Sequence, residues 1–277
     1  MNIAVVLPAD GSVVEMPFFQ NLIIGICNIA STSDYDVIML TQKENDISQI
    51  ERVVKHKKVD GVILTRSMAK NIDAEYLEEN DVPFVIIGSS PDKTIQIDHD
   101  HLSACRDLTS SVLAGYDKDI LKGNIALIGN EMQYMVNQSR YLGFLEGIRS
   151  VGLSDDDFTF FSMDSKTMIK HVVNKIIENE QRIIFCFDDL ICEYALLELG
   201  KHGIRVPEDI VVASYYCSYI IENHYPKIAT IKFDAKILGE TAFNTLIELL
   251  SEKEVLQRTL LEYKIVNNTD RIQGYRQ

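Results

Sequence analysis

Two adjacent acidic residues follow one of the apolar segments of this sequence and are the first candidates for chemistry. Asp188 and Asp189 come directly after Ile183–Phe187 and open a predicted helix. A carboxylate there can cap backbone N–H groups and offset the helix dipole, but only one of the two can be the cap. We predict that Asp189 caps the helix and that Asp188 binds a ligand. Adjacent carboxylates do not face one another across a substrate, so the pair is not predicted to be catalytic.

A single arginine is the second candidate. Arg140 lies in the first turn of a helix predicted over Ser139–Ser150. A cation in the first turn opposes the helix dipole, so its placement needs another reason. The guanidinium group offers a fork of donors that could reach a ligand. The alternative is a surface arginine that pairs with Glu146 or Asp164.

Aromatic side chains at segment ends could stack on a sugar ring or a base. Five of them are candidate ligand contacts: Phe18, Phe19, Tyr134, Phe161 and Tyr216. Packing in the core is the alternative for the three phenylalanines; it is favoured for Phe19 and stays open for Phe18 and Phe161. Tyr216 follows the apolar segment Ile210–Ala213, where a polar ligand contact is expected.

The other reactive side chains form no recognisable active site. His99 and His101 make an H-x-H next to Asp98 and Asp100, a composition that could bind a metal. Matching ligands are not visible elsewhere, so a polar loop at a helix start is favoured. The sequence has no G-x-G-x-x-G, no G-x-x-x-x-G-K-[ST] and no G-x-S-x-G. We therefore predict no metal, no cofactor and no catalytic activity.

Short continuous apolar runs alternate with amphipathic helices and must position these residues. The predicted strands are Ile3–Leu7, Asp36–Leu40, Gly61–Thr65, Phe84–Ile87, Thr94–Ile97, Ile125–Ile128, Phe158–Phe161, Ile183–Phe187, Ile210–Ala213, Thr230–Phe233 and Leu260–Val266. Continuous runs are typical of strands buried on both faces, and their alternation with helices predicts α/β structure with doubly wound parallel sheets. Ligands bind beyond the carboxyl ends of such strands.

The length predicts two such sheets, because 277 residues are more than one core usually holds. We expect two subdomains with a ligand cleft between them. The first subdomain is predicted to comprise residues 1–118 plus 227–252. The second is predicted to comprise residues 119–226 plus 253–277.

Composition limits the partners. The net charge of −14 makes binding of nucleic acid by this chain itself unfavourable. No apolar run reaches the roughly 18 residues of a membrane span, and MNIAVVLPADG lacks the basic region of a signal peptide. Five scattered cysteines without a C-x-x-C indicate reduced thiols. We expect a cytoplasmic protein without a membrane partner.

The order of the segments resembles the effector-binding portion of LacI-type transcription regulators, the family of the lac and galactose repressors. The most specific stretch is FCFDDLICEYALLELGKHGIRVPEDIVV, with a D-D pair, a helix, G-I-R-V-P-E-D-I and a strand. Nearly the whole chain is covered, through further matches at IAVVLP, MPFFQNLIIGICNIASTSDYDVIML, VDGVIL, VPFVIIG, SRYLGFLEGIRSVGL and YPKIATIKFDAKILGETAFNTLIELL. This portion of the family is itself similar to periplasmic sugar-binding proteins.

The resemblance also implies ligand contacts. Where residues match, the family's contacts fall on Arg140, Asp188, Phe18, Phe19 and Phe161. The family's aspartate, which receives ligand hydroxyls or ring nitrogens, is replaced here by Tyr216. This departure leaves open a different ligand, a modified sugar or a response to a partner protein.

The function implied by the resemblance is the sensing of a sugar or sugar-like effector by a transcriptional repressor that acts as a homodimer. Closure of the cleft would change the geometry of the dimer. Family members contact DNA through an N-terminal helix-turn-helix, which is absent from this sequence, so DNA is expected as a partner only through such a head. A stand-alone solute-binding protein without DNA-binding activity is the alternative.

Overall fold

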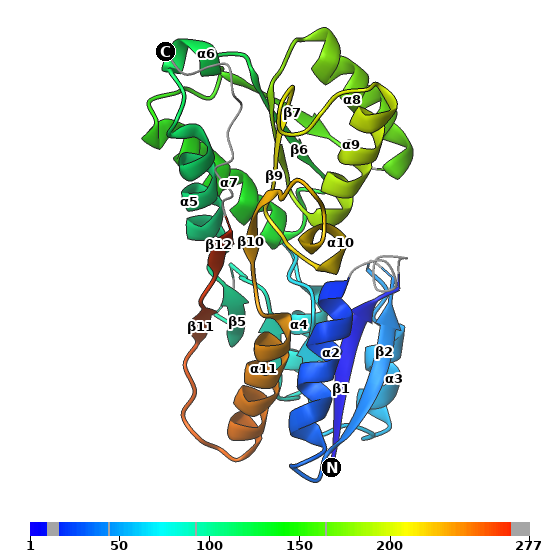
Figure 1. Cartoon of the computed structure of the whole chain (residues 1–277). Coiled ribbons are helices and arrows are strands. Elements are labelled where there is room, and N and C mark those ends of the chain that lie inside the picture. Colours follow the sequence, from blue (N-terminus) through cyan, green and yellow to red (C-terminus); the bar gives the residue numbers. More distant parts are fainter. Residues whose placement is uncertain (10–16, 44, 92, 164, 267–277) are drawn as a thin grey trace. The chain divides into compact units, whose positions relative to one another are not determined.

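The computed structural model describes residues 1–9, 17–43, 45–91, 93–163 and 165–266 and divides into two compact units (Figure 1). Unit 1 comprises Met1–His99, Gln133–Val136 and Asp234–Glu262. Unit 2 comprises Asp100–Met132, Asn137–Phe233 and Tyr263–Gln277. Within the described ranges each unit holds one six-stranded sheet, so the predicted α/β fold with two parallel-sheet subdomains is confirmed.

The sheet of unit 1 has the strand order β11-β5-β4-β3-β1-β2, and all neighbouring strands are parallel. Its strands are β1 (Asn2–Pro8), β2 (Asp36–Gln42), β3 (Gly61–Leu64), β4 (Phe84–Ile87), β5 (Gln96–His99) and β11 (Arg258–Leu261). The chain winds outward in both directions from β1, which pairs with β2 on one side and with β3 on the other.

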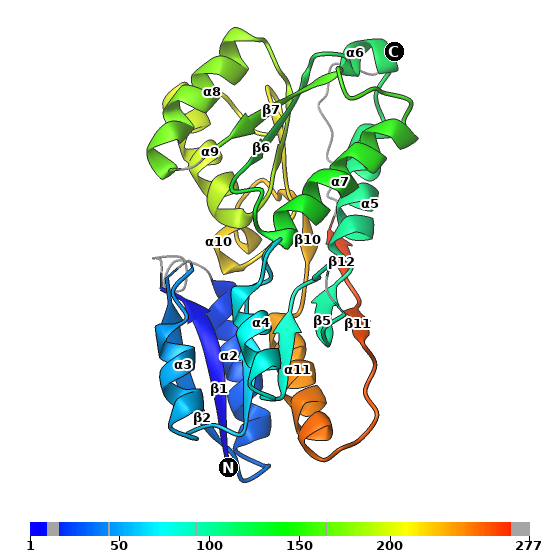
Figure 2. The ribbon, with the colours of Figure 1, turned by 180° about the vertical axis from the view of Figure 1, so that it is seen from behind.

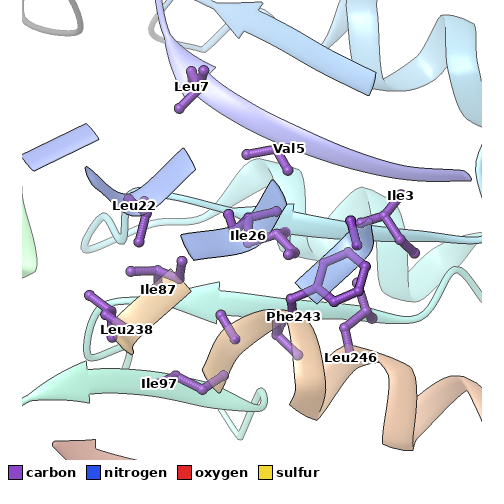
Figure 3. Close-up of a cluster of buried hydrophobic side chains, with 14 of the residues drawn as sticks. Ile3, Val5, Leu7, Leu22, Ile26, Ile87, Ile97, Leu238, Phe243 and Leu246 are labelled. Carbon is purple, nitrogen blue, oxygen red and sulfur yellow. The ribbon is translucent and has the colours of Figure 1, made fainter. Parts of the chain in front are cut away.

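Helices cover both faces of this sheet, and every residue of β1 from Ile3 on is therefore buried. Its odd-numbered residues, from Ile3 to Leu7, pack against α2 (Pro17–Ala30) and α11 (Ala235–Leu250) (Figure 3). Its even-numbered residues pack in a second cluster with α3 (Ser48–Lys55) and α4 (Ile72–Glu79). The continuous apolar run therefore serves two cores, as such runs do in parallel sheets.

The sheet of unit 2 repeats this plan in the order β12-β10-β9-β8-β6-β7. Its strands are β6 (Ile125–Gly129), β7 (Phe158–Ser162), β8 (Ile183–Cys186), β9 (Val211–Ser214), β10 (Ala229–Lys232) and β12 (Lys264–Val266). Here β6 pairs with both β7 and β8, and only the described pair of β10 and β12 is antiparallel.

Four long helices cover the sheet of unit 2. In Figures 1 and 2, α5 (His101–Leu113) and α7 (Met135–Ser150) lie on one face, and α8 (Ile169–Glu178) and α9 (Asp189–Lys201) lie on the other. Short elements complete the unit: α6 (Lys118–Leu121), the 3-10 helix η1 (Lys166–Met168) and α10 (Tyr219–Glu222).

The units are bounded differently from the predicted subdomains. Helix α5, predicted in the first subdomain, belongs to unit 2 because it packs on β10 and β12. The segment Leu260–Val266, predicted as one strand, is divided between β11 of unit 1 and β12 of unit 2. Glu262 and Tyr263 lie between these strands and mark the change of unit.

Candidate functional site

The strand orders define one switch point in each sheet. In unit 1 it lies between β1 and β3, and in unit 2 it lies between β6 and β8, because the chain winds away from these strands in opposite directions. Ligands of doubly wound sheets bind at the carboxyl ends of the strands beside this point. The predicted residues are therefore described by the strand end they follow.

Asp188 and Asp189 follow β8 as predicted, but their roles are exchanged. Asp188 has an extended backbone, and its Oδ1 accepts a hydrogen bond from Ile191 N at 2.9 Å. It is therefore the cap of α9, and the prediction that Asp189 caps this helix was wrong. Burial raises the pKa of Asp188, while the nearby Arg140 lowers it. The predicted contact between Asp188 and a ligand stays a prediction.

Asp189 does not cap α9 but bonds to a residue of another loop. Its carboxylate accepts a hydrogen bond from the hydroxyl of Ser218, and both residues are buried. Burial raises the pKa of Asp189 to about 6, and the hydroxyl of Ser218 opposes that rise. Ser218 also caps α10 by accepting from Ile220 N at 3.1 Å. Ser218 was not predicted, because nothing in the sequence around it indicates a contact with a residue 29 positions away.

Arg140 lies in the second turn of its helix, not the first, because α7 begins at Met135. Arg140 therefore does not lie in the first turn, where the helix dipole would oppose its charge. Its Nη1 donates to Oδ1 of Asn137 at 3.2 Å, and Asn137 is held in turn by Asn130 at 2.8 Å. Among the described residues, the buried Nε of Arg140 finds no hydrogen-bond partner.

Glu146, one of the two alternative partners predicted for Arg140, pairs with Arg106: its Oε2 lies 3.8 Å from Nη1 of Arg106. Asp164 lies outside the described residues. The positive charge of Arg140 instead lowers the pKa of both Asp188 and Asp189, which places it near the start of α9.

The two tyrosines after β9 face different surroundings. Tyr215 is fully buried, and its hydroxyl lies 2.5 Å from Oγ1 of Thr109. Tyr216 is also buried, and its ring stacks on Phe233 with centroids 6.4 Å apart and an interplanar angle of 14°. Its predicted role as a ligand contact is not tested by this packing.

The aromatics at the start of α2 lie beside the switch point of unit 1. Phe19 is buried in the hydrophobic core, which is the alternative that the sequence favoured. Phe18 is partly buried and meets Phe19 edge-on at a centroid distance of 5.2 Å. Phe161 is half-buried in β7, the edge strand of unit 2, opposite Ile128 of β6. The ligand roles of the three phenylalanines stay predictions.

Tyr134 belongs to unit 1 although the strand before it belongs to unit 2. It forms an isolated β-bridge with Met68, just after β3. Arg66 places its guanidinium carbon 4.4 Å from the centroid of the Tyr134 ring, and its Nη1 donates to the Tyr134 hydroxyl at 3.1 Å. Arg66 was not among the predicted residues, although it lies directly after the predicted strand Gly61–Thr65.

The H-x-H is divided between the units. His99 ends β5 in unit 1, and His101 opens α5 in unit 2. Asp100 between them caps α5 by accepting from Ser103 N at 3.0 Å. The predicted helix start is confirmed. The metal-binding alternative for this stretch stays open.

Comparison with known proteins identifies the family to which this chain belongs. The family described as the periplasmic binding protein-like domain matches residues 123–268, and the chain belongs to that family. It is homologous to LacI-type regulators, as the resemblance implied. The HTH-type transcriptional regulator MalR of Streptococcus pneumoniae is 25% identical over 285 residues, which cover 95% of this chain and 80% of the relative.

Solved structures show the same fold. A probable maltose operon transcriptional repressor from Staphylococcus aureus superposes with a TM-score of 0.87 at 20% identity, covering 99% of this chain and 98% of that one. A complex of the transcriptional regulator CelR with cellobiose superposes with a TM-score of 0.83 at 20% identity, covering 96% and 83%. Among the residues described here, no helix is both long and apolar enough to cross a membrane.

Proposed function

We propose that this chain senses a small-molecule effector for a DNA-binding transcription regulator. The observation that carries the proposal is the cluster of Arg140 with Asp188 and Asp189 at the switch point of unit 2. An arginine with a buried, unused donor suits a ligand oxygen. Homology over 95% of the chain to an HTH-type regulator favours this role over a stand-alone solute-binding protein.

The effector class that we propose is a sugar or sugar-like molecule. CelR, which shares the fold, was solved with cellobiose, and this supports a pocket of suitable size but not a particular sugar. Tyr216 stands where the family has an aspartate, so recognition at that strand end relies on ring stacking. Hydroxyl groups are left to Arg140 and Asp188.

The regulatory mechanism that we propose is population shift. An effector that binds at the carboxyl edge of a sheet and prefers one conformation of the protein shifts the population toward that conformation. That conformation sets the geometry of a homodimer. The relatives are regulators rather than enzymes, and we propose that no reaction takes place on the effector.

Large exposed apolar side chains support the homodimer. Ile24 and Met39 of unit 1 are 51% and 58% exposed, and Tyr219 and Tyr225 of unit 2 are 63% and 89% exposed. Side chains of this kind are enriched in interfaces between subunits. We further propose that the protein is cytoplasmic and that DNA is bound by a helix-turn-helix outside these 277 residues, as the names of the relatives imply.

Replacement of Arg140 tests the sensor. A thermal-shift titration of the chain with cellobiose, maltose and ribose should identify a stabilising sugar, and Arg140→Ala should abolish that stabilisation. Arg149→Ala is the matched control, because Arg149 lies on the same helix and pairs with Asp155 at 2.9 Å. Unchanged binding by Arg140→Ala would count against the proposed site.

A further inference from the structure

A surface cavity of about 420 Å³ lies in unit 1, between α4 and the connection from β4 to β5. Six residues line it: Ala74, Glu75, Glu78, Pro91, Lys93 and Thr94. None of these six belongs to β1 or β3, the strands on either side of the switch point of unit 1, so the cavity is a separate feature. Its volume lies within the range of about 300–1,000 Å³ that is typical of small-molecule sites.

Three exposed charged side chains line this cavity. Glu75 and Glu78 are three positions apart on α4, so their carboxylates lie on the same face of the helix. Lys93 brings an ammonium group from the connection between β4 and β5. Although opposite charges line one cavity, these three groups form no ion pair with any residue in the described ranges. They are therefore available to a ligand that carries the complementary charges.

Thr94 adds an unused hydroxyl group to the same cavity. The residue is 5% exposed, and its buried Oγ1 has no hydrogen-bond partner within the part of the chain that the structure describes. Buried polar groups without a partner are rare because they cost free energy of folding. Since Thr94 lines the cavity, a polar ligand there can supply the missing hydrogen bond.

Hydrogen bonds fix the two walls of the cavity relative to each other. Ser90, which precedes Pro91, donates from its backbone N to Oε1 of Gln96 at 3.0 Å and accepts from Nε2 of Gln96 at 2.9 Å. Asn71, the residue before α4, donates from Nδ2 to Oγ of Ser90 at 3.4 Å and so joins the loop to the helix. Walls that are held before binding lose little conformational entropy when a ligand binds.

We propose that this cavity is a second ligand site and that it binds a basic amino acid of the lysine, ornithine or arginine type. Such a molecule carries two cationic groups and one carboxylate at neutral pH. The two cations complement Glu75 and Glu78, and the carboxylate complements Lys93. A diamine leaves Lys93 without a partner, and a neutral amino acid leaves one glutamate without a partner. The basic amino acid is the ligand that satisfies all three charges.

Three related molecules test the proposal on the whole chain: lysine, norleucine, which lacks the side-chain amine, and cadaverine, which lacks the carboxylate. Chemical-shift titrations of the isotope-labelled chain at pH 7 and constant ionic strength measure each affinity and locate each site. Lysine should bind about 2- to 5-fold more tightly than either of the others, the usual effect of one exposed ion pair. The largest shifts should fall on the backbone amides of Glu75, Glu78, Lys93 and Thr94.

Charge-removing variants assign each ligand group to its partner. Lys93→Gln should lower the affinity for lysine to that for cadaverine and should change the affinity for cadaverine by less than about 2-fold. The double variant Glu75→Gln/Glu78→Gln should weaken binding of lysine and cadaverine more than binding of norleucine. Glu79→Gln and Lys70→Gln are the matched controls, because both side chains are exposed and neither lines the cavity. Both controls should bind lysine as the wild type does.

The hydroxyl group of Thr94 is tested separately. Thr94→Val replaces the hydroxyl with a methyl group of similar size, so it should weaken binding of lysine by about 2- to 10-fold. The melting temperature of each variant without ligand verifies its fold.

The outcomes decide between the basic amino acid and its alternatives. A preference for lysine that Lys93→Gln removes supports the second site. Equal affinities for the three molecules, or shifts confined to residues outside the cavity, overturn it. Shifts at Glu75 and Glu78 that CaCl2 produces and the three molecules do not would also overturn it, in favour of a simple cation site. Replacement of Arg140 tests the sugar sensor independently of all these results.

Discussion

At the scale of single residues, Asp188 and Asp189 have different roles because Ser218 bonds to only one of them. Two adjacent acids after a strand predict one cap, yet the choice between Asp188 and Asp189 depends on Ser218, which reaches Asp189 from another loop. Successive strand residues point to opposite faces. Tyr215 and Tyr216 are therefore expected to point in opposite directions, but the sequence does not show which of them contacts Thr109 in the core.

The buried carboxylate of Asp189 gives a prediction for stability against pH. Burial raises its pKa from 3.8 to about 6, so the folded state holds the proton more tightly than the unfolded chain does. The stability that this group contributes is therefore present below about pH 4 and is lost as the pH rises through about 6. The loss amounts to about 3 kcal/mol.

Replacement of this carboxyl should remove the effect. Between pH 4 and 7, the free energy of unfolding of the wild type should fall relative to that of Asp189→Asn, as measured by urea denaturation at each pH. Asp209→Asn is the control: Arg205 lowers the pKa of Asp209 from 3.8 to about 2, so the contribution of that carboxylate is lost only below about pH 4 and stays nearly constant between pH 4 and 7. Parallel pH profiles for the wild type and Asp189→Asn would show that the carboxyl does not titrate in this range.

At the scale of elements, strong periodic patterns were predictable and weak ones were not. The predicted end of α7 at Ser150 is confirmed, and Gly152 adopts a φ of +81° just after it. The start of α7 was missed by four residues because Met135–Gln138 carries no capping signal. Helix α4 was missed because it is polar and buries only Ala74 and Leu77.

Close packing of α2 against α11 leaves no room for a side chain at Gly239. A Cβ added at Gly239 would lie 2.3 Å from the carbonyl oxygen of Leu22, which is backbone and cannot move aside freely. Gly239→Ala should therefore lower the free energy of unfolding by about 1–3 kcal/mol. Gly200→Ala is the matched control: that helical glycine has open space around it, so alanine should stabilise by about 0.5–1 kcal/mol. Equal changes in the midpoint of urea unfolding would contradict the packing argument.

At the scale of the whole molecule, the two units were predictable but their bounds were not. Alternating strands and helices indicate two sheets, whereas the assignment of a helix to one sheet depends on tertiary packing. Helix α5 illustrates this, because its neighbours β10 and β12 come from segments more than 100 residues further on. The net charge of −14 disfavours DNA binding by these 277 residues themselves.

The interleaved units predict how fragments behave. Residues 1–99 contain five strands of unit 1 but lack α11, whose Leu238, Phe243 and Leu246 cover one face of the sheet. This fragment should bind a hydrophobic dye and unfold without a cooperative transition. The same residues joined to 234–262 by a Gly/Ser linker should regain cooperative unfolding by circular dichroism. Cooperative unfolding of 1–99 alone would show that α11 is dispensable.

The division of the last two strands has a consequence for synthesis. β11 and β12 each pair with the end strand of a different sheet, and only Glu262 and Tyr263 separate them. Because a ribosome makes the chain from its N-terminus, both sheets stay one strand short until residues 258–266 have emerged. A nascent or prematurely terminated chain presents the unpaired edges of β5 and β10 at the same time, and such edges template aggregation. Emergence of this short segment thus completes both sheets in one step.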